Sequence, residues 1–191
     1  MNLNELKDRA YKIAKAHGWH DQELSNETYL MLIITEIAEA VNADRNGKHA
    51  NISMFKANYN TPQTKPEKHW KYIYELFIKN SVEDELADII IRCLSFAGHR
   101  RWDLQHTLDE MKGTSDMDVI IGDEAFVETA FYTCDEFFGC YSNSSAKEAV
   151  GGLLVSVAEY CNYKGIDLWW HVEQKMRYNE LRPYKHGGKA Y

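Results

Sequence analysis

The segment from Ser81 to Arg92 places acidic side chains at the start of an apolar helix, and this restricts the folds that are open to the chain. Asp84 follows Ser81 by three residues, which is the spacing of an N-terminal capping box. Glu85 and Asp88 are also three residues apart, so a helix puts them on one face beside apolar neighbours. Two carboxylates at the edge of a buried stripe repel each other unless a cation lies between them. The segment therefore predicts a helix with a partly buried acidic face.

The rest of the chain has the same helical periodicity and few signals for strands. Apolar residues recur three and four positions apart, and capping residues, glycines and prolines mark the ends of the helical segments. These marks predict one helix that ends at Gly18, one from Ser25 or Asn26 to about Gly47, one that begins at Pro66, and one from Ser81 to about Gly98. Residues 46–65 are polar and are predicted to be a loop. We expect a single all-α domain over residues 1–191, a bundle of about six to seven helices.

The composition limits the possible partners. Of the 191 residues, 29 are acidic and 22 are basic, so the formal charge is −7. Because DNA and RNA polymers bind to basic surfaces, this charge argues against a nucleic-acid polymer as the partner. No apolar run reaches the length of about 20 residues that a membrane span needs, so we expect no membrane partner. The four cysteines form no CxxC pair and fall in apolar helical patterns, which predicts reduced thiols and a cytoplasmic protein.

The second half of the chain repeats the pattern of the acidic helix. Three capping positions recur 64 residues later, in the pairs Ser81 and Ser145, Asp84 and Glu148, and Asp103 and Asp167. Apolar runs follow the caps in both copies, which favours an internal duplication. In the second copy, however, Ala149 stands in the place of Glu85, and Gly152 in the place of Asp88. We infer that residues 103–165 form an extra helical half, a degenerate repeat of residues 81–112 that has lost the acids.

A second acidic pair lies in an earlier helix. Glu36 and Glu39 are three residues apart among isoleucine and alanine neighbours, as are Glu85 and Asp88 in their helix. If both pairs face inward, four carboxylates meet, and hard oxygen ligands in that number suit Mg²⁺, with Mn²⁺ as a second possibility. The plain alternative is that these residues are surface acids at the rim of the bundle. A di-iron centre is disfavoured, because it requires Glu-x-x-His on two helices and neither pair supplies a histidine.

The two acidic pairs belong to an ordered set of motifs. The set begins with His17-Gly18-Trp19-His20, continues with Glu36-x-x-Glu39 and Glu85-x-x-Asp88, and ends with Lys175-x-x-Tyr178-Asn179-x-x-Arg182. It resembles the signature of the MazG-like all-α nucleoside triphosphate pyrophosphohydrolases, which are relatives of the dimeric dUTPases. The resemblance implies an enzyme that splits a nucleotide between its α and β phosphates, with a monophosphate and pyrophosphate as products. It further implies that Glu36, Glu39, Glu85 and Asp88 bind Mg²⁺.

The remaining candidate residues follow from the chemistry of that reaction. Glu36 is our candidate for the carboxylate that takes a proton from the attacking water. Lys175, Asn179 and Arg182 are spaced to share one helix face and would bind the phosphates. Tyr178 is off that face, so it either contacts the substrate or packs nearby. Trp19 either stacks on the base or closes the core.

The chain departs from the short pattern of the family in one respect. Met111, Ser115 and Asp118 stand where the first copy would carry the Lys, Asn and Arg of the tail, and the matching tail appears only in the second copy. If the extra half replaces packing that a partner subunit would give, tail and acids must lie within about 15 Å of each other. A homodimer remains possible. The alternatives to the enzyme are a silent nucleotide- or metal-binding regulator and a purely structural adaptor.

Overall fold

Every regular element in the described part of the chain is a helix. The computed structural model describes residues 2–61, 64–106 and 125–188. Within these ranges the helices are α1 (Leu3–Ala16), α2 (Asn26–Arg45), α3 (Ile52–Tyr59), α4 (Pro66–Phe77), α5 (Val82–Arg100), α7 (Phe126–Asn143), α8 (Ala146–Lys164), α9 (Leu168–Glu180) and α10 (Lys185–Gly188). The predicted all-α class is therefore confirmed.

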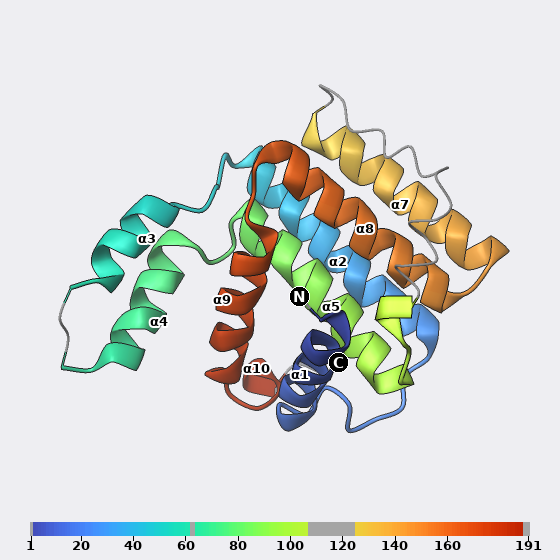
Figure 1. The fold of residues 1–191 in the computed structure, drawn as a ribbon, viewed down its shortest axis with the longest axis horizontal. Helices are drawn as coiled ribbons and strands as arrows, with labels where there is room; N and C mark the ends of the chain where they lie inside the picture. Colours follow the sequence, from blue (N-terminus) through green and yellow to red (C-terminus); the bar gives the residue numbers. More distant parts are fainter. Residues whose placement is uncertain (1, 62–63, 107–124, 189–191) are drawn as a thin grey trace.

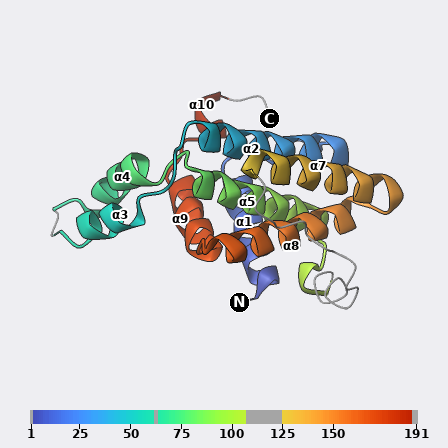
Figure 2. The same cartoon turned by 90° about the horizontal axis from the view of Figure 1, so that it is seen from above.

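Helix α5 is the centre of the bundle. Helices α1, α2, α8 and α9 all pack against it, and α7 covers α2 and α8 on the outside (Figure 1). Seen from above, α2, α5 and α8 run alongside one another, while α9 crosses them steeply (Figure 2). This central position follows from the composition of α5, because most of its side chains after the first turn are apolar or small.

The core consists of one large cluster and one smaller cluster. The large cluster joins the bundle helices through fully buried aliphatic side chains, among them Leu30, Ile33, Ile90, Leu94, Val150 and Val172. The smaller cluster surrounds Trp70 and Tyr74 and ties α3 and α4 to the bundle through Tyr178 of α9. These two helices extend away from the bundle in both views (Figures 1 and 2). The first turn of α5 meets this extension, where the hydroxyl of Tyr74 donates a hydrogen bond to Asp84.

The predicted caps form at the same places in both copies of the repeat. The capping bonds run from Asp84 N–H to Ser81 Oγ (3.2 Å), from Glu148 N–H to Ser145 Oγ (3.3 Å), from His106 N–H to Asp103 Oδ1 (3.1 Å) and from Trp170 N–H to Asp167 Oδ1 (3.1 Å). Each bond satisfies an amide at a helix start that has no partner within the helix. The four caps thus preserve the offset of 64 residues in hydrogen bonds as well as in sequence.

The two copies also end in the same way. Arg101 after α5 and Gly165 after α8 are both left-handed, with φ of 59° and 69°. The next amide in each copy bonds back to a carbonyl five residues earlier, Trp102 to Ala97 at 2.9 Å and Ile166 to Cys161 at 2.8 Å. Met111, Ser115 and Asp118 lie outside the described residues. The duplication stays a hypothesis, supported by matched helix starts and matched helix ends.

The prediction of a loop over residues 46–65 was wrong. Helix α3 begins inside it, where Asn51 Oδ1 accepts a hydrogen bond from Met54 N–H. The segment is helical because Phe55 is buried against the aromatic residues of α4 and α9, and this long-range packing outweighs a polar local sequence. The short α3 and α10 also raise the number of described helices to nine, above the expected six to seven.

Two further expectations concern the surface and the thiols. No helix of the described residues is long and apolar enough to cross a membrane. All four cysteines are free, Cys93 and Cys161 in the core and Cys134 and Cys140 partly covered at its edge. This agrees with the prediction that the cysteines do not form disulfides.

Gly98 provides a test of the packing between α1 and α5. A Cβ at this position would lie 2.5 Å from Cβ of Tyr11, so Gly98→Ala must push the two helices apart. We expect the variant to lose about 1–3 kcal/mol of unfolding free energy in urea titrations. Gly139→Ala in α7 is the matched control, because its Cβ would meet nothing and a helical alanine adds about 0.5–1 kcal/mol. Equal stability of the two variants would contradict the close approach.

Candidate metal centre

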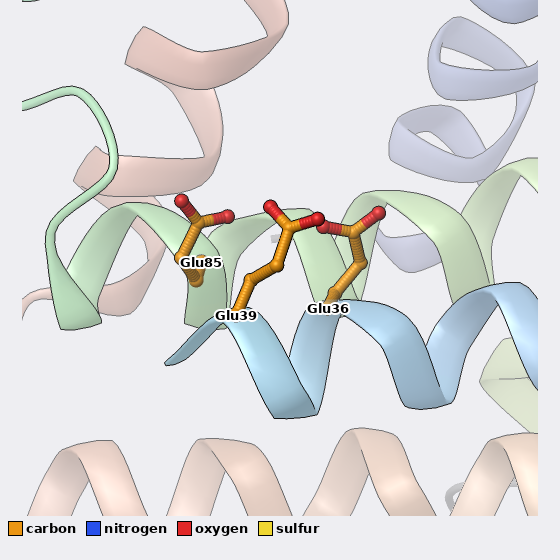
Figure 3. A group of neighbouring side chains, drawn as sticks. All are labelled: Glu36, Glu39 and Glu85. Carbon is orange, nitrogen blue, oxygen red and sulfur yellow. The ribbon is translucent and has the colours of Figure 1, made fainter. Parts of the chain in front are cut away.

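The two acidic pairs come from neighbouring helices and share one cavity. Glu36 and Glu39 lie on α2, and Glu85 lies on α5, with one carboxylate oxygen of each within 4.8 Å of the others. Figure 3 shows the three carboxylates turned toward the same side of the two helices. Asp88, the fourth predicted ligand, lines the same cavity one turn after Glu85. The structure thus brings together four acids whose two pairs are separated by more than forty residues in the sequence.

Glu36 and Glu85 are buried and Glu39 is exposed, so burial makes the negative charge of the first two unfavourable. It raises the pKa of Glu36 to about 7, an effect that the charge of Asp88 increases and the guanidinium of Arg92 reduces. Burial likewise raises the pKa of Glu85 to about 8, although the ammonium of Lys175 opposes this shift. Neither Glu39 nor Glu85 has a hydrogen-bond or ion-pair partner for its carboxylate within the described chain. Such a set of hard oxygen donors fits a divalent cation such as Mg²⁺ or Mn²⁺.

Lys175 is an internal counter-ion of the cluster. Its Nζ lies 2.7 Å from Oδ2 of Asp84 and 2.7 Å from Oδ2 of Asp88, and only 3% of the residue is exposed. Burial alone would lower its pKa, but the carboxylates of Asp88 and Asp84 raise it well above the usual value. The lysine predicted to bind phosphate is therefore already engaged by two carboxylates. The contact also shows that the tail of the second copy reaches the acids of the first copy within one chain.

Asp84 anchors this ion pair from beneath the cluster. Its backbone N–H makes the predicted cap with Ser81, but its side chain is buried and accepts bonds from the hydroxyl of Tyr74 and from Asn80 N–H (2.8 Å). The sequence indicated only a helix-cap and dipole role for this acid. The tertiary structure adds a second role, because Asp84 fixes the ammonium of Lys175 beside Asp88.

Arg92 is a site residue that the sequence analysis did not single out. Its Nε donates a 2.6 Å hydrogen bond to Oε1 of Glu36 and forms an ion pair with it. The available signal was its position one helical turn after Asp88, on the same face of α5. An arginine there is ordinarily solvated, so its spacing alone did not distinguish it.

The acids lie at one end of a cavity of about 300 Å³. Asn179 and Arg182 line it, as expected, and Oδ1 of Asn179 is buried there without a hydrogen-bond partner among the described residues. Trp19 lines the cavity as well. Tyr178 does not, because it stacks on Tyr74 with 4.7 Å between ring centroids and donates a 2.8 Å hydrogen bond to Glu75. Of the two interpretations offered for Tyr178, its position fits packing.

The opposite end of the cavity is aromatic. His20 lies there, with Nε2 2.8 Å from Ser95 Oγ and Nδ1 3.1 Å from the hydroxyl of Tyr29. Burial and the charge of His99, whose ring stacks on His20 at 4.7 Å, lower the pKa of His20 to about 4. The ring is therefore neutral at ordinary pH. The cavity therefore joins an acidic end to a flat, largely uncharged end.

Comparisons of this chain with protein-family models, with curated proteins and with solved structures return no match. The resemblance to the MazG-like hydrolases therefore rests on the sequence motifs alone.

Variants of Lys175 and Lys79 test which of these two cations is needed for the stability of the site. Lys175→Met leaves the buried Asp84 and the partly buried Asp88 without their cation, so we expect a loss of about 3–5 kcal/mol of unfolding free energy. Lys79→Met is the control, since Lys79 also lines the cavity but is partly exposed over the ring of Tyr178, and we expect at most about 1 kcal/mol. Chemical denaturation measures both. Similar losses would argue that Lys175 is not the internal counter-ion.

The raised pKa of Glu85 makes the stability of the metal-free protein depend on pH. Its pKa is about 8 in the folded protein against an ordinary value of 4.5, so stability is fully present below pH 4.5 and is lost as pH rises toward 8. Glu85→Gln removes this loss. We expect the metal-free variant to exceed the wild type by about 2 kcal/mol at pH 8, with a smaller difference at pH 5. Urea titrations at the two pH values, with exposed Glu148→Gln as the control, test this. A difference that is independent of pH would refute the assignment.

Proposed function

We propose that this protein is a metal-dependent nucleotide pyrophosphohydrolase, which converts a nucleoside or deoxynucleoside triphosphate to a monophosphate and pyrophosphate. The observation that carries the proposal is the joint placement of four carboxylates, the polar tail and an aromatic end around one cavity. Each part alone is common in helical proteins. Together they would supply a cation site, phosphate ligands and a flat face for a base around one cavity.

The residues divide the work of hydrolysis between them. Glu36, Glu39, Glu85 and Asp88 would hold Mg²⁺, and Asn179 and Arg182 would bind the phosphates from the tail. When bound, the divalent cation would neutralise phosphate charge and lower the pKa of a coordinated water. In this proposal Glu36 takes the proton of the attacking water, whose oxygen bonds to one of the two phosphorus atoms of the α–β bridge. That bridge breaks, and pyrophosphate and the monophosphate leave.

The aromatic end would receive the nucleobase. His20 lines the cavity there, and its neutral ring is fixed by bonds to Tyr29 and Ser95. Trp19, the residue before it in the chain, also lines the cavity. Base stacking on such planes contributes about 1–3 kcal/mol per base and does not depend on a particular base. The proposal accordingly names the class of substrate and the bond cleaved.

A nucleotide panel with product identification tests the function. With Mg²⁺ we expect a monophosphate and pyrophosphate from at least one triphosphate, and no turnover after chelation. Glu36→Gln, Glu39→Gln, Glu85→Gln and Asp88→Asn should each lower kcat/KM about 100-fold or more, because each removes a cation ligand. Glu83→Gln is the matched control, since Glu83 lies in the same turn of α5 but accepts its hydrogen bond from Ala50 N–H at 2.8 Å.

The outcomes also separate the alternatives. Nucleotide binding without turnover of any triphosphate would favour the regulatory protein over the enzyme. Failure of Mg²⁺ and Mn²⁺ to raise the melting temperature, together with failure to bind any nucleotide, would favour the structural adaptor. Orthophosphate as the released product would show that a different bond is cleaved.

A further inference from the structure

The side chains of α5 that line the cavity show which residues lie near its acidic end and which lie near its aromatic end. Glu85, Asp88, Arg92 and Ser95 all line it and follow one another along one face of the helix. With a rise of about 1.5 Å per residue, the guanidinium-bearing position lies about 6 Å beyond Asp88 and about 4.5 Å before Ser95. Arg92 is therefore attached at the junction of the acidic end and the aromatic end.

The other cations of the cavity lie elsewhere. Lys79 and Arg182 both lie over the ring of Tyr178, at 5.4 Å and 6.0 Å from its centroid. That ring stacks on Tyr74, whose hydroxyl donates to Asp84, so both cations lie near the acidic end. Lys175 forms ion pairs with Asp84 and Asp88. Among the cationic side chains that line the cavity in the described chain, Arg92 alone comes from the turn between the acids and the aromatic end.

Arg92 uses only part of its bonding capacity. Its Nε bonds to Glu36, and its two terminal amino groups have no hydrogen-bond or ion-pair partner within the residues that the structure describes. The side chain is 36% exposed, whereas that of Glu36 is only 6% exposed. A guanidinium with free amino groups in a cavity is suited to bind phosphate oxygens in a fork.

We propose that Arg92 is the residue that binds the α-phosphate, and that it exchanges Glu36 for this phosphate when the metal-bound nucleotide enters. The inference rests on the proposed function. Glu36 cannot give its full charge to both a divalent cation and Arg92, so a bound cation weakens the ion pair and frees the guanidinium. The base then lies toward Ser95 and the pyrophosphate toward Lys79 and Arg182. In the metal-free protein, the ion pair with Glu36 thus holds Arg92 in the cavity until the substrate binds.

Ligands that contain only one part of the substrate test this assignment. A nucleoside monophosphate retains the α-phosphate, whereas inorganic pyrophosphate represents the other two. With Mn²⁺ present, we expect Arg92→Gln to weaken binding of the monophosphate about tenfold or more and to leave pyrophosphate affinity within about twofold. Arg182→Gln should show the reverse pattern. Titration calorimetry measures all of these affinities without any turnover.

Metal binding in the absence of nucleotide provides the second readout. Because Arg92 competes with the cation for Glu36, Arg92→Gln should bind Mn²⁺ as tightly as the wild type or more tightly. Arg9→Gln is the matched control, since Arg9 forms a 2.6 Å ion pair with Glu173 and is 38% exposed but does not line the cavity. It should change neither metal nor monophosphate affinity.

The results that would overturn the proposal are distinct from failure of the enzyme hypothesis. Weaker Mn²⁺ binding by Arg92→Gln would mean that Arg92 only positions Glu36 as a ligand. Loss of pyrophosphate affinity with intact monophosphate affinity would show that Arg92 binds the β- or γ-phosphate and not the α-phosphate. If the wild type hydrolyses nothing but binds both ligands, the proposed activity fails while the assignment of Arg92 is still decided by these affinities.

Discussion

The buried ammonium of Lys175 between the carboxylates of Asp84 and Asp88 is the interaction on which the site depends. A buried charge is tolerated only when it is paired; here Lys175 and Asp84 are buried, and Asp88 is 18% exposed. The ion pairs fix α9 against the N-terminal turns of α5, and the hydroxyl of Tyr74 brings α4 to the same point. The cavity exists because these helices meet around a charged group rather than closing over an apolar one.

The same charges divide the acids into two kinds. Asp84 and Asp88 have an internal cation, and Glu36 shares Arg92, so their negative charge is partly balanced in the metal-free protein. Burial raises the pKa of Glu85 to about 8, and the more distant charge of Lys175 opposes this shift only in part. A divalent cation would complete this balance. Without a metal ion, the site therefore keeps an excess of negative charge at the place where the proposed chemistry needs a cation.

The comparison of α5 with α8 shows why one copy of the repeat carries the acids. In α8, Ala149 occupies the position that corresponds to Glu85 and is 1% exposed within the main core. A carboxylate there would be buried without a cavity and without a lysine. Helix α8 packs against α5 and α7, whereas the acidic face of α5 meets α2 and α9 across the cavity. The two helices begin with equivalent caps, but they pack against different neighbours, and this decides which helix can carry buried carboxylates.

The sequence by itself determined the helices and the two acidic pairs, because caps, apolar periodicity and a spacing of three residues are local properties. It therefore predicted Ser81 as a cap, which the structure confirms, and Glu36 and Glu85 as members of two acidic pairs, which line one cavity although Glu39 is exposed. It could not determine that Lys175 would be a counter-ion, that Tyr178 would pack on Tyr74, or that residues 52–59 would be helical. Those outcomes, like the pairing of Arg92 with Glu36 across 56 residues, depend on which helix faces pack together. Only the tertiary structure decides this, since packing and desolvation act between segments that local periodicity does not relate.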